Sequence, residues 1–459
     1  MRIPMPLKEM ASIFTRHGYS LYMVGGAVRD MLLGKKPDDF DVATNATPRQ
    51  VLEMFRYAIP TGIEHGTVTI PFKGSHFECT TFRAEQGYSD GRHPDKISFA
   101  TTIEEDLSRR DFTMNAIAVS IPQGTIIDPF HGKNDISASV IRTVGNPLER
   151  FSEDGLRPLR AIRFASQLGF QIHENTIAAI PATLSVTAKV SIERIRDEFI
   201  KILLSKQPSS ALRLMENTGM MRLLLPELSV CRGVIQKGLH VFDVLDHLLA
   251  ACDVCPIHRL DVLLATLFHD IGKPLVREID ENGEPTFYLH EKKSAEIAVR
   301  IMNRMKFPVK LTKEVSHLME NHMFHYEPCW TDAAVRRFIG RIGYERIETL
   351  FAVRYADSQA ITGKQALHDN LDDLRQRIKS VSAQGDAISV KDLAISGNDI
   401  VQTGIQPGPI IGLILKEILE AVIDDPSLNT KEKLVGIAQE IQATRYQDSK
   451  SSIARIKSH

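Results

Sequence analysis

The stretch from Leu21 to Thr44 limits the possible folds of this chain more than any other. It reads LYMVGGAVRDMLLGKKPDDFDVAT. The apolar run at 21–24 predicts a buried strand, Gly25 and Gly26 interrupt it, and residues 27–33 have the pattern of a short helix. A strand that passes through glycines into a helix start presents backbone N–H groups to an anion. The stretch therefore predicts a phosphate-binding turn at the edge of a sheet.

Charged side chains complete this pattern. Arg29, in the predicted helix, carries a guanidinium that can grip phosphate oxygens with two hydrogen bonds. Asp39 and Asp41 lie two residues apart on a segment that we expect to be extended, so both carboxylates point to one face. Neighbouring carboxylates repel each other unless a cation lies between them, and oxygen ligands suit Mg²⁺. A phosphate cradle beside a metal-binding acid pair is what nucleotidyl transfer to a hydroxyl requires.

The segments GGAVRDMLLG and DDFDVAT together resemble the signature of the class II nucleotidyltransferases, the family of bacterial CCA-adding enzymes and bacterial poly(A) polymerases. The resemblance implies an α+β N-terminal nucleotidyltransferase head, with a small mixed sheet and helices, followed by an all-α neck, body and tail. It also implies that Gly26 and Arg29 hold the nucleotide. Glu78, on the predicted strand 76–82, would complete the metal site, although alternation alone favours an outward-facing residue.

A second motif, DLSRRDFTMNA, spans residues 106–116. Two arginines beside an aspartate are consistent with a plain surface ion pair. The motif also matches the family's second signature, which implies that Arg110 contacts the incoming nucleotide while Asp111 and Asn115 shape the pocket. Residues 83–99 before it are polar and contain Gly and Pro, which predicts a mobile loop. This loop is similar to one in family members that add the terminal adenosine, and it argues against an enzyme that adds only the two cytidines.

Residues 150–168 predict one continuous helix with Ser152 as its N-cap. Asp154, Arg157, Arg160 and Arg163 follow at intervals of three and form a charged stripe. The ordinary interpretation is an ion pair within a helix beside exposed arginines, which stabilises the helix only weakly.

A chemical interpretation of this stripe is sharper. Cytosine and adenine each show an amino donor beside a ring-nitrogen acceptor, so an acidic acceptor and an arginine donor match both bases. Uracil and guanine reverse this order and would leave polar groups unpaired. The segment SEDGLRPLRAIRFASQLGF resembles the family's EDxxR motif, which implies that Asp154 and Arg157 read the base and that Arg160 and Arg163 help to hold the nucleotide.

A second metal site is indicated beyond residue 225. LLATLFHDIGKP places His269 and Asp270 at the end of an apolar helix, and His240 and Asp357 are the further candidate ligands. This set resembles the HD-type metal phosphohydrolases, some of which keep the helices and lose the activity, so a working metal site stays open. His247 is the alternative to His240. We expect the other histidines of this region on the surface or in loops: His290, His317, His322 and His325.

Length and composition place outer limits on these interpretations. A chain of 459 residues is long enough for about three domains. A formal net charge of −1 means that a nucleic-acid site must be a local patch. Cys252 and Cys255 form a lone CxxC in an apolar segment, which we interpret as core packing. No apolar run approaches the length of a membrane span, so we expect a cytoplasmic protein.

These expectations define the predicted organisation. The head spans 1–144, the neck with its base-reading helix and RNA-binding region spans 145–228, the HD-like body spans 229–383, and the helical tRNA-binding tail spans 384–459. The predicted activity is addition of C, C and A to the 3′ end of tRNA from ATP and CTP with Mg²⁺, releasing pyrophosphate. An A-only adder, a poly(A) polymerase, an HD-type phosphohydrolase and a non-catalytic tRNA-binding protein are the alternatives, and the oligomeric state stays open.

Overall fold

The computed structural model describes residues 3–63, 66–86, 96–238, 241–362 and 368–446. Its N-terminal part is built on a seven-stranded sheet in the order β3-β4-β5-β2-β1-β8-β9. The strands are β1 (Leu21–Val24), β2 (Asp41–Thr44), β3 (Ile59–Gly62), β4 (Thr67–Phe72), β5 (Ser75–Thr81), β8 (Ala118–Ile121) and β9 (Ile126–Ile127). β2 and β5 pair in parallel, whereas β1 pairs antiparallel with both β2 and β8. The predicted small mixed sheet is therefore confirmed.

Short helices surround this sheet: α1 (Met5–Arg16), α2 (Gly26–Leu32), α3 (Pro48–Met54), α4 (Ile103–Ser108) and α5 (Gly132–Ser137). The glycine turn after β1 leads directly into α2, as the first motif predicts. The start of α3 is fixed by a capping box, in which Thr47 accepts a hydrogen bond from the Gln50 backbone and the Gln50 side chain accepts one from the Thr47 backbone. Local sequence signals thus determine most of the head.

The predicted loop at 83–99 has regular structure at both ends. Its two ends form the antiparallel strands β6 (Arg83–Gln86) and β7 (Lys96–Phe99), with Arg83 opposite Phe99. Residues 87–95 of the predicted mobile loop lie outside the described residues.

The helix predicted over 150–168 is wrong as a single element. The structure has α6 (Pro147–Glu153) and α7 (Arg157–Leu168), and the N-cap of the first is Asn146 rather than Ser152. Asp154 between them has extended backbone, with φ −140° and ψ 109°. The cause is Pro158, which has no N–H to donate to the Asp154 carbonyl and so cannot continue a helix through this point.

The neck continues through further short helices: α8 (Glu174–Ala182), α9 (Leu184–Thr187), α10 (Ile192–Leu203), α11 (Pro208–Asn217), α12 (Met220–Leu224) and α13 (Pro226–Ser229). The body contains α14 (Val244–Val254), α15 (Leu260–Phe268), α16 (Lys273–Val276), α17 (His290–Arg304), α18 (Val309–Asn321), α19 (Asp332–Ile342), α20 (Ile347–Thr362) and α21 (His368–Ala383), with a small hairpin of β12 (Glu278–Ile279) and β13 (Pro285–Thr286). One contiguous buried core runs through head, neck and body and includes Cys252 and Cys255, both as free thiols.

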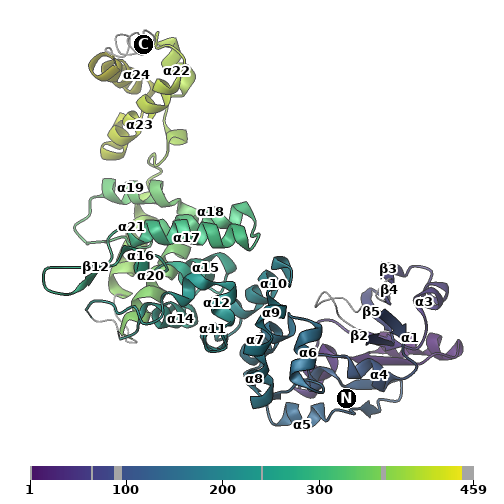
Figure 1. Cartoon of the computed structure of the whole chain (residues 1–459). Coiled ribbons are helices and arrows are strands. Elements are labelled where there is room, and N and C mark those ends of the chain that lie inside the picture. The colour runs from purple at the N-terminus through teal and green to yellow at the C-terminus, as the bar shows by residue number, and fades with distance from the viewer. Residues whose placement is uncertain (1–2, 64–65, 87–95, 239–240, 363–367, 447–459) are drawn as a thin grey trace, which may run out of the picture.

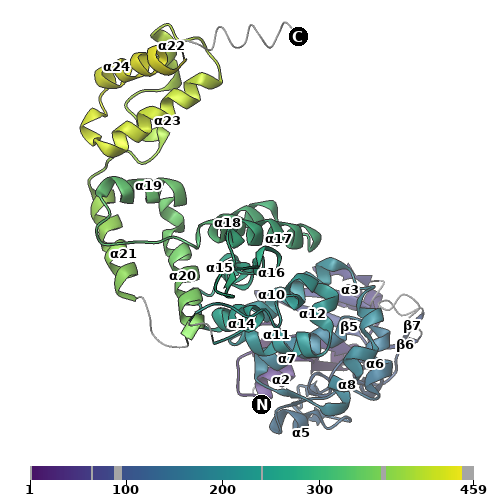
Figure 2. The same cartoon turned by 60° about the vertical axis from the view of Figure 1, so that its left-hand side comes forward.

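The tail has a core of its own. Helices α22 (Gly397–Gln402), α23 (Pro409–Asp424) and α24 (Lys431–Ile441) pack around residues such as Ile400, Ile418 and Leu434. It joins the body through α19, where Arg337 donates hydrogen bonds to Glu420 and Asp424 of α23 at 2.7 and 2.8 Å. Figures 1 and 2 show the resulting elongated molecule, with the head at one end and the tail at the other.

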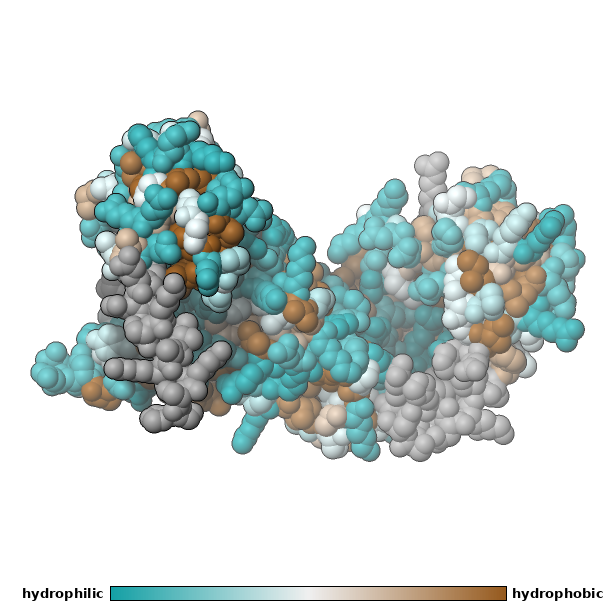
Figure 3. All heavy atoms as spheres, turned by 90° about the horizontal axis from the view of Figure 1, so that it is seen from above, coloured by the Kyte–Doolittle hydropathy of each residue, from teal (hydrophilic) through white to brown (hydrophobic). Residues whose placement is uncertain are grey.

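The face in Figure 3 is mostly hydrophilic, with scattered hydrophobic residues rather than a continuous apolar band. None of the described helices combines the length and the apolar character that a membrane crossing needs.

Candidate active site

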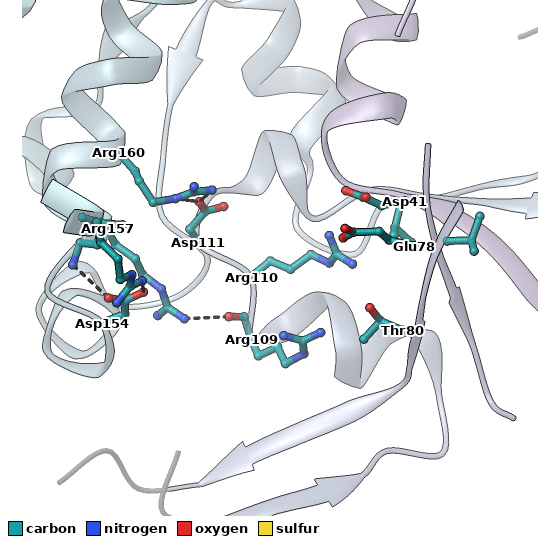
Figure 4. Close-up of a pocket in the computed structure, with 13 residues that line it drawn as sticks. Asp41, Glu78, Thr80, Arg109, Arg110, Asp111, Asp154, Arg157 and Arg160 are labelled. Carbon is teal, nitrogen blue, oxygen red and sulfur yellow. Dashed lines mark hydrogen bonds and ion pairs between the residues drawn. The ribbon is translucent and has the colours of Figure 1, made fainter. Parts of the chain in front are cut away.

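A cleft of about 360 Å³ lies between the sheet of the head and the first helices of the neck. Its lining comes from widely separated parts of the chain: Val24, Asp41, Val42, Glu78, Thr80, Arg109, Arg110, Asp111, Asp154, Leu156, Arg157, Arg160 and Arg194. Figure 4 shows Asp41 and Glu78 on one side, Asp154 and Arg157 on the other, and the Arg110 side chain between them. Asp41 of the predicted acid pair, Glu78 and the predicted Asp154–Arg157 couple therefore share one cleft, whereas Asp39 is not among its lining residues.

The acidic side of the cleft is set by sheet register. Asp41 begins β2 and stands opposite Glu78 on the parallel strand β5, so both side chains lie on the same face. Burial, followed by the Glu78 charge, raises the pKa of Asp41 from its ordinary value of 3.8, and Asp39 adds to this while Arg110 opposes it. Asp39 is exposed and lies in a bend before β2, so the extended segment expected to carry both aspartates begins only at Asp41. These acids repel one another as they stand, which is the condition that a bound cation relieves.

Arg110 is held in place by a buried acid that the sequence did not single out. Asp106 is fully buried and accepts hydrogen bonds from Arg109 Nη2 at 2.7 Å and from Arg110 Nη2 at 3.2 Å. The plain surface ion pair considered for this motif is thus wrong. A Cβ added at Gly25 would lie 2.9 Å from Arg110 Nη1 and 3.8 Å from Asp41 Oδ2. The glycine turn therefore leaves room for the arginine beside the acid pair.

Arg29 connects the first motif to the second. Its Nη1 donates to Asn115 Oδ1 at 3.0 Å, its Nε donates to Asp30 at 2.9 Å, and its guanidinium lies over the Phe164 ring. Neither Gly26 nor Arg29 is among the residues that line the cleft. Asn115 in turn donates to Asp111 at 3.1 Å, so Arg29 is linked through Asn115 to a residue that lines the cleft.

Asp154 and Arg157 lie at the break between α6 and α7. Asp154 Oδ1 accepts from the Leu156 N–H at 3.0 Å, and Arg157 Nη2 donates to the Arg109 carbonyl at 3.1 Å. Arg157 Nη1 also contacts Glu153 and the Arg150 carbonyl. These contacts fix both side chains before any ligand arrives. The break matters for this arrangement, because it brings Asp154 out of helical backbone and turns it toward the cleft.

Arg160 and Arg163, predicted as a pair, separate in the structure. Arg160 lines the cleft and donates from Nε and Nη2 to Asp111 Oδ2 at 2.9 and 2.7 Å. Burial alone raises the pKa of Asp111, but the Arg160 charge and the hydrogen bonds from Asn115 and Arg160 outweigh it and lower that pKa to about 2. Arg163 is buried away from the cleft, with its guanidinium against Glu198 and the Phe164 ring.

Arg194 is a charged lining residue that sequence reasoning missed. It is the third residue of α10, and its Nη2 donates to Asp154 Oδ2 at 2.8 Å. Glu198, one turn later on α10, holds this helix against α7 because it contacts both Arg160 and Arg163. The signal available in the sequence was the alternation of charges in SIERIRDE, which shows neither partner.

A second cluster lies inside the body. His247, His269, Asp270 and Asp357 offer ligand atoms within 4.8 Å of one another, and all four are buried. His247 Nε2 lies 3.1 Å from His269 Nε2 and 3.2 Å from Asp357 Oδ1. Burial alone lowers the pKa of His269, but Asp270 and Asp357 overcome this and raise it to about 10. The structure thus places the alternative His247 with the predicted ligands, whereas His240 lies outside the described residues.

Two histidines expected on the surface are buried beside this cluster. His290 begins α17 and His322 ends α18, and with Asp270 they form a second group that could hold a metal ion. His322 Nε2 has no hydrogen-bond partner among the described residues. The expectation failed because both helix ends point into the body, which local sequence does not reveal. His317 is half-buried against the Ile342 carbonyl, and His325 is exposed as expected.

Family models match three successive parts of the chain. Residues 21–142 match the poly A polymerase head domain, residues 169–231 match a probable RNA and SrmB-binding site of polymerase A, and residues 286–438 match a putative tRNA nucleotidyltransferase domain 2. The matches follow the order of head, neck and body with tail.

Individual relatives agree over nearly the whole chain. A CCA-adding enzyme from Geobacillus sp. (strain WCH70) is 35% identical over 420 residues, which are 91% of this chain and 92% of the relative. One from Lactobacillus delbrueckii subsp. bulgaricus is 34% identical over 90% of this chain and 92% of its own. The crystal structure of the Bacillus stearothermophilus CCA-adding enzyme in complex with CTP is 30% identical, has a TM-score of 0.72, and aligns with 97% of this chain and 100% of that one. By these relationships the chain belongs to the CCA-adding enzyme family of tRNA nucleotidyltransferases.

Proposed function

We propose that this protein adds C, C and A to the 3′ end of tRNA, using CTP and ATP and no nucleic-acid template. In each step the 3′-hydroxyl oxygen of the tRNA attacks the α-phosphorus of the incoming nucleotide. The new O–P bond forms as the bond between the α-phosphorus and the oxygen that bridges it to the β-phosphate breaks, the hydroxyl proton passes to water, and pyrophosphate leaves. The observation that carries the proposal is the cleft whose lining includes two acids of the sheet and the acid–arginine couple: Asp41, Glu78, Asp154 and Arg157.

Asp41 and Glu78, together with Asp39, are the proposed holders of Mg²⁺. The fit rests on the in-register pairing of Asp41 with Glu78 and on the raised pKa of Asp41, because closely spaced carboxylates gain most from a divalent cation. When bound, Mg²⁺ would activate the 3′-hydroxyl and stabilise the departing pyrophosphate. Gly26, Arg29 and Arg110 are the proposed triphosphate contacts, and of these Arg110 is the one that lines the cleft.

Asp154 and Arg157 are the proposed readers of the base. A carboxylate and a guanidinium at one wall offer an acceptor and a donor, which match the amino group and ring nitrogen of cytosine and adenine. Arg160 lines the same cleft, where its ion pair with Asp111 holds it, and is a proposed nucleotide contact. For Arg163 we propose a structural role instead, since it is buried against Glu198 outside the cleft.

The tRNA itself would be held by the neck, body and tail. A net charge of −1 favours recognition of the acceptor arm by its shape and by local phosphate contacts rather than by a general attraction to RNA.

We further propose a cytoplasmic location, where tRNA, CTP and ATP are present together. The proposed units remain the head at 1–144, the neck at 145–228, the body at 229–383 and the tail at 384–459.

Three tRNAs test the proposal directly: one that ends before the first C, one that ends after one C, and one that ends after CC. Each is offered to purified protein with labelled CTP or ATP. We expect CTP to be incorporated on the first two and ATP on the third. Incorporation of ATP on the third alone would identify an A-adder, and long runs of adenosine on any of them would identify a poly(A) polymerase.

A second candidate function belongs to the body. We propose that His247, His269, Asp270 and Asp357 form an HD-type metal site, with His290 and His322 completing a second position around Asp270. Imidazole and carboxylate ligands of this kind suit divalent transition metals, which activate water for hydrolysis of phosphoesters. Metal analysis of the purified protein and of His247→Ala tests the site. Hydrolysis of a generic phosphodiester that His247→Ala loses and Asp41→Asn retains would support the activity, and its absence with every divalent metal would contradict it.

A further inference from the structure

Asp154 has a fixed orientation in the cleft, although it lies between two helices rather than within one. Its Oδ1 accepts a hydrogen bond from the Leu156 N–H at 3.0 Å. Its Oδ2 accepts one from Arg194 Nη2 at 2.8 Å, across from α10. With one bond on each oxygen, the plane of the carboxylate is set. The bond to Leu156 is local, whereas the bond to Arg194 joins residues 40 positions apart and is the one that ties the carboxylate to another element.

The Arg194 guanidinium is held through one of its nitrogens, Nη2. This group lines the same cleft, yet its Nη1 is buried and has no hydrogen-bond partner among the described residues. A buried donor without a partner is costly and gains from any acceptor that comes within reach. If Asp154 were to turn away, Arg194 would present donors where the carboxylate now presents acceptors. With Asp154 held in place, this wall therefore accepts a base with an amino group; with Asp154 turned away, it would accept a base with a carbonyl oxygen.

We infer that Arg194 is a specificity-determining positioning residue, which acts by fixing the Asp154 carboxylate rather than by touching the reacting atoms. Held by Arg194, Asp154 offers an acceptor to the amino group of cytosine or adenine. The carbonyl oxygen of uracil or guanine at that position meets the carboxylate, where acceptor faces acceptor. This inference rests on the proposed reading of the base by Asp154 and Arg157.

The test measures how strongly the enzyme prefers CTP over UTP. The substrate is a tRNA that ends before the first C, and the readout is the ratio of kcat/KM for CTP to that for UTP. Arg194→Met keeps the length of the side chain and removes its donors. We expect this ratio to fall at least about tenfold, mainly through a higher KM for CTP. Arg194→Lys keeps a positive charge and hydrogen-bond donors but loses the planar guanidinium, so its ratio should lie between those of wild type and Arg194→Met.

Arg196→Met is the matched control. Arg196 lies on the same helix, pairs with Asp197 at 2.9 Å and donates to the Lys306 carbonyl, and it is not among the lining residues of the cleft. Its CTP-to-UTP ratio should stay at the wild-type value. Thermal unfolding of each variant establishes that it folds, and if Arg194→Met does not, Arg194→Lys decides the question.

The outcomes separate this inference from the proposal beneath it. Equal losses for CTP and UTP in Arg194→Met and Arg194→Lys, with an unchanged ratio, would mean that Arg194 only supports the fold and would overturn the inference. Asp154→Ala is run beside them. If Asp154→Ala keeps the CTP preference, the proposed reading of the base is wrong; if it loses the preference while both Arg194 variants keep it, only the positioning role is wrong.

Discussion

Asp41 and Glu78 stand opposite each other in register on the parallel strands β2 and β5, although they are far apart in the chain. Parallel pairing places both carboxylates on one face of the sheet, and Val24, at the end of β1, pairs with Asp41 from the other side. The glycine turn therefore begins where the acid pair lies. This single register relationship connects the first motif to the proposed metal site.

Binding of Mg²⁺ should depend on pH through Asp41. Burial and the Glu78 charge raise the pKa of Asp41 above its ordinary value. Protons therefore compete with Mg²⁺ for this carboxylate at a higher pH than they would for an ordinary aspartate. Calorimetric titration with Mg²⁺ across a pH series measures this dependence. Glu78→Gln removes one source of repulsion, so we expect weaker binding overall and an onset of the loss at lower pH. Glu53→Gln, on the exposed side of α3, should match wild type, and an unmoved onset in Glu78→Gln would count against the pairing.

The Asp111–Arg160 pair should stabilise the fold above about pH 4. The pKa of Asp111 is lowered to about 2 in the folded protein, from an ordinary 3.8. A lowered carboxyl pKa gives stability that is complete above the unfolded value and is lost as pH falls through the folded value, here between about pH 4 and pH 2. The shift corresponds to about 2 kcal/mol. Urea unfolding of wild type and Asp111→Asn should differ by about this much at pH 6, and the difference should shrink toward pH 2. A difference that does not depend on pH would contradict the assignment.

Gly25 should be needed for Arg110 as well as for its own backbone. Gly25 and Gly34 flank α2 and both have positive φ, 69° and 72°, so alanine is strained at either position. Only at Gly25 would a Cβ also meet Arg110 Nη1, at 2.9 Å, whereas nothing lies within 4 Å at Gly34. We expect both alanine variants to lose about 1 kcal/mol or more of stability, and only Gly25→Ala to raise the KM for CTP, by about tenfold. Equal KM values in the two variants would show that the close approach is unimportant.

Gly155 should not tolerate alanine, despite lying beside a helix start. A Cβ there would come within 2.5 Å of the Val186 carbonyl oxygen, which is backbone and cannot move aside. Gly155→Ala should therefore lower the free energy of unfolding by about 1–3 kcal/mol and weaken base selection, because Asp154 is its neighbour. Gly436→Ala, in α24 with open space around it, should instead stabilise its helix by about 0.5–1 kcal/mol. Thermal unfolding compares the two, and a gain in stability from Gly155→Ala would refute the contact.

The sequence predicted well wherever the signal is local. The apolar run, the glycines and the helix of the first motif appear as β1 (Leu21–Val24) and α2 (Gly26–Leu32), and the capped start of α3 follows from Thr47 and Pro48. The cleft itself was predictable because three motifs resemble those of one family. Their convergence could not be worked out from spacing, since it depends on strand register and on helix packing.

The predictions that failed share a physical cause, which is contact between residues that are far apart in the sequence. A charged stripe at intervals of three suggested one helix through Asp154, but Pro158 breaks it, and that break exposes the carboxylate to the cleft. Arg163 carries a charge yet is buried, because Glu198 on α10 neutralises it. His290 and His322 are buried because their helix ends turn inward. Arg194 escaped notice for the same reason, since its partner lies 40 residues away.

The central claim is that the acids of the sheet and the Asp154–Arg157 couple act on one nucleotide. A crystal structure with Mg²⁺ and a non-hydrolysable CTP analogue tests it most directly. We predict that the triphosphate lies against Asp41, Glu78 and Arg110 while the amino group of the cytosine donates to Asp154. A triphosphate at the acids with its base directed away from Asp154 and Arg157, or a nucleotide bound outside this cleft, would contradict it.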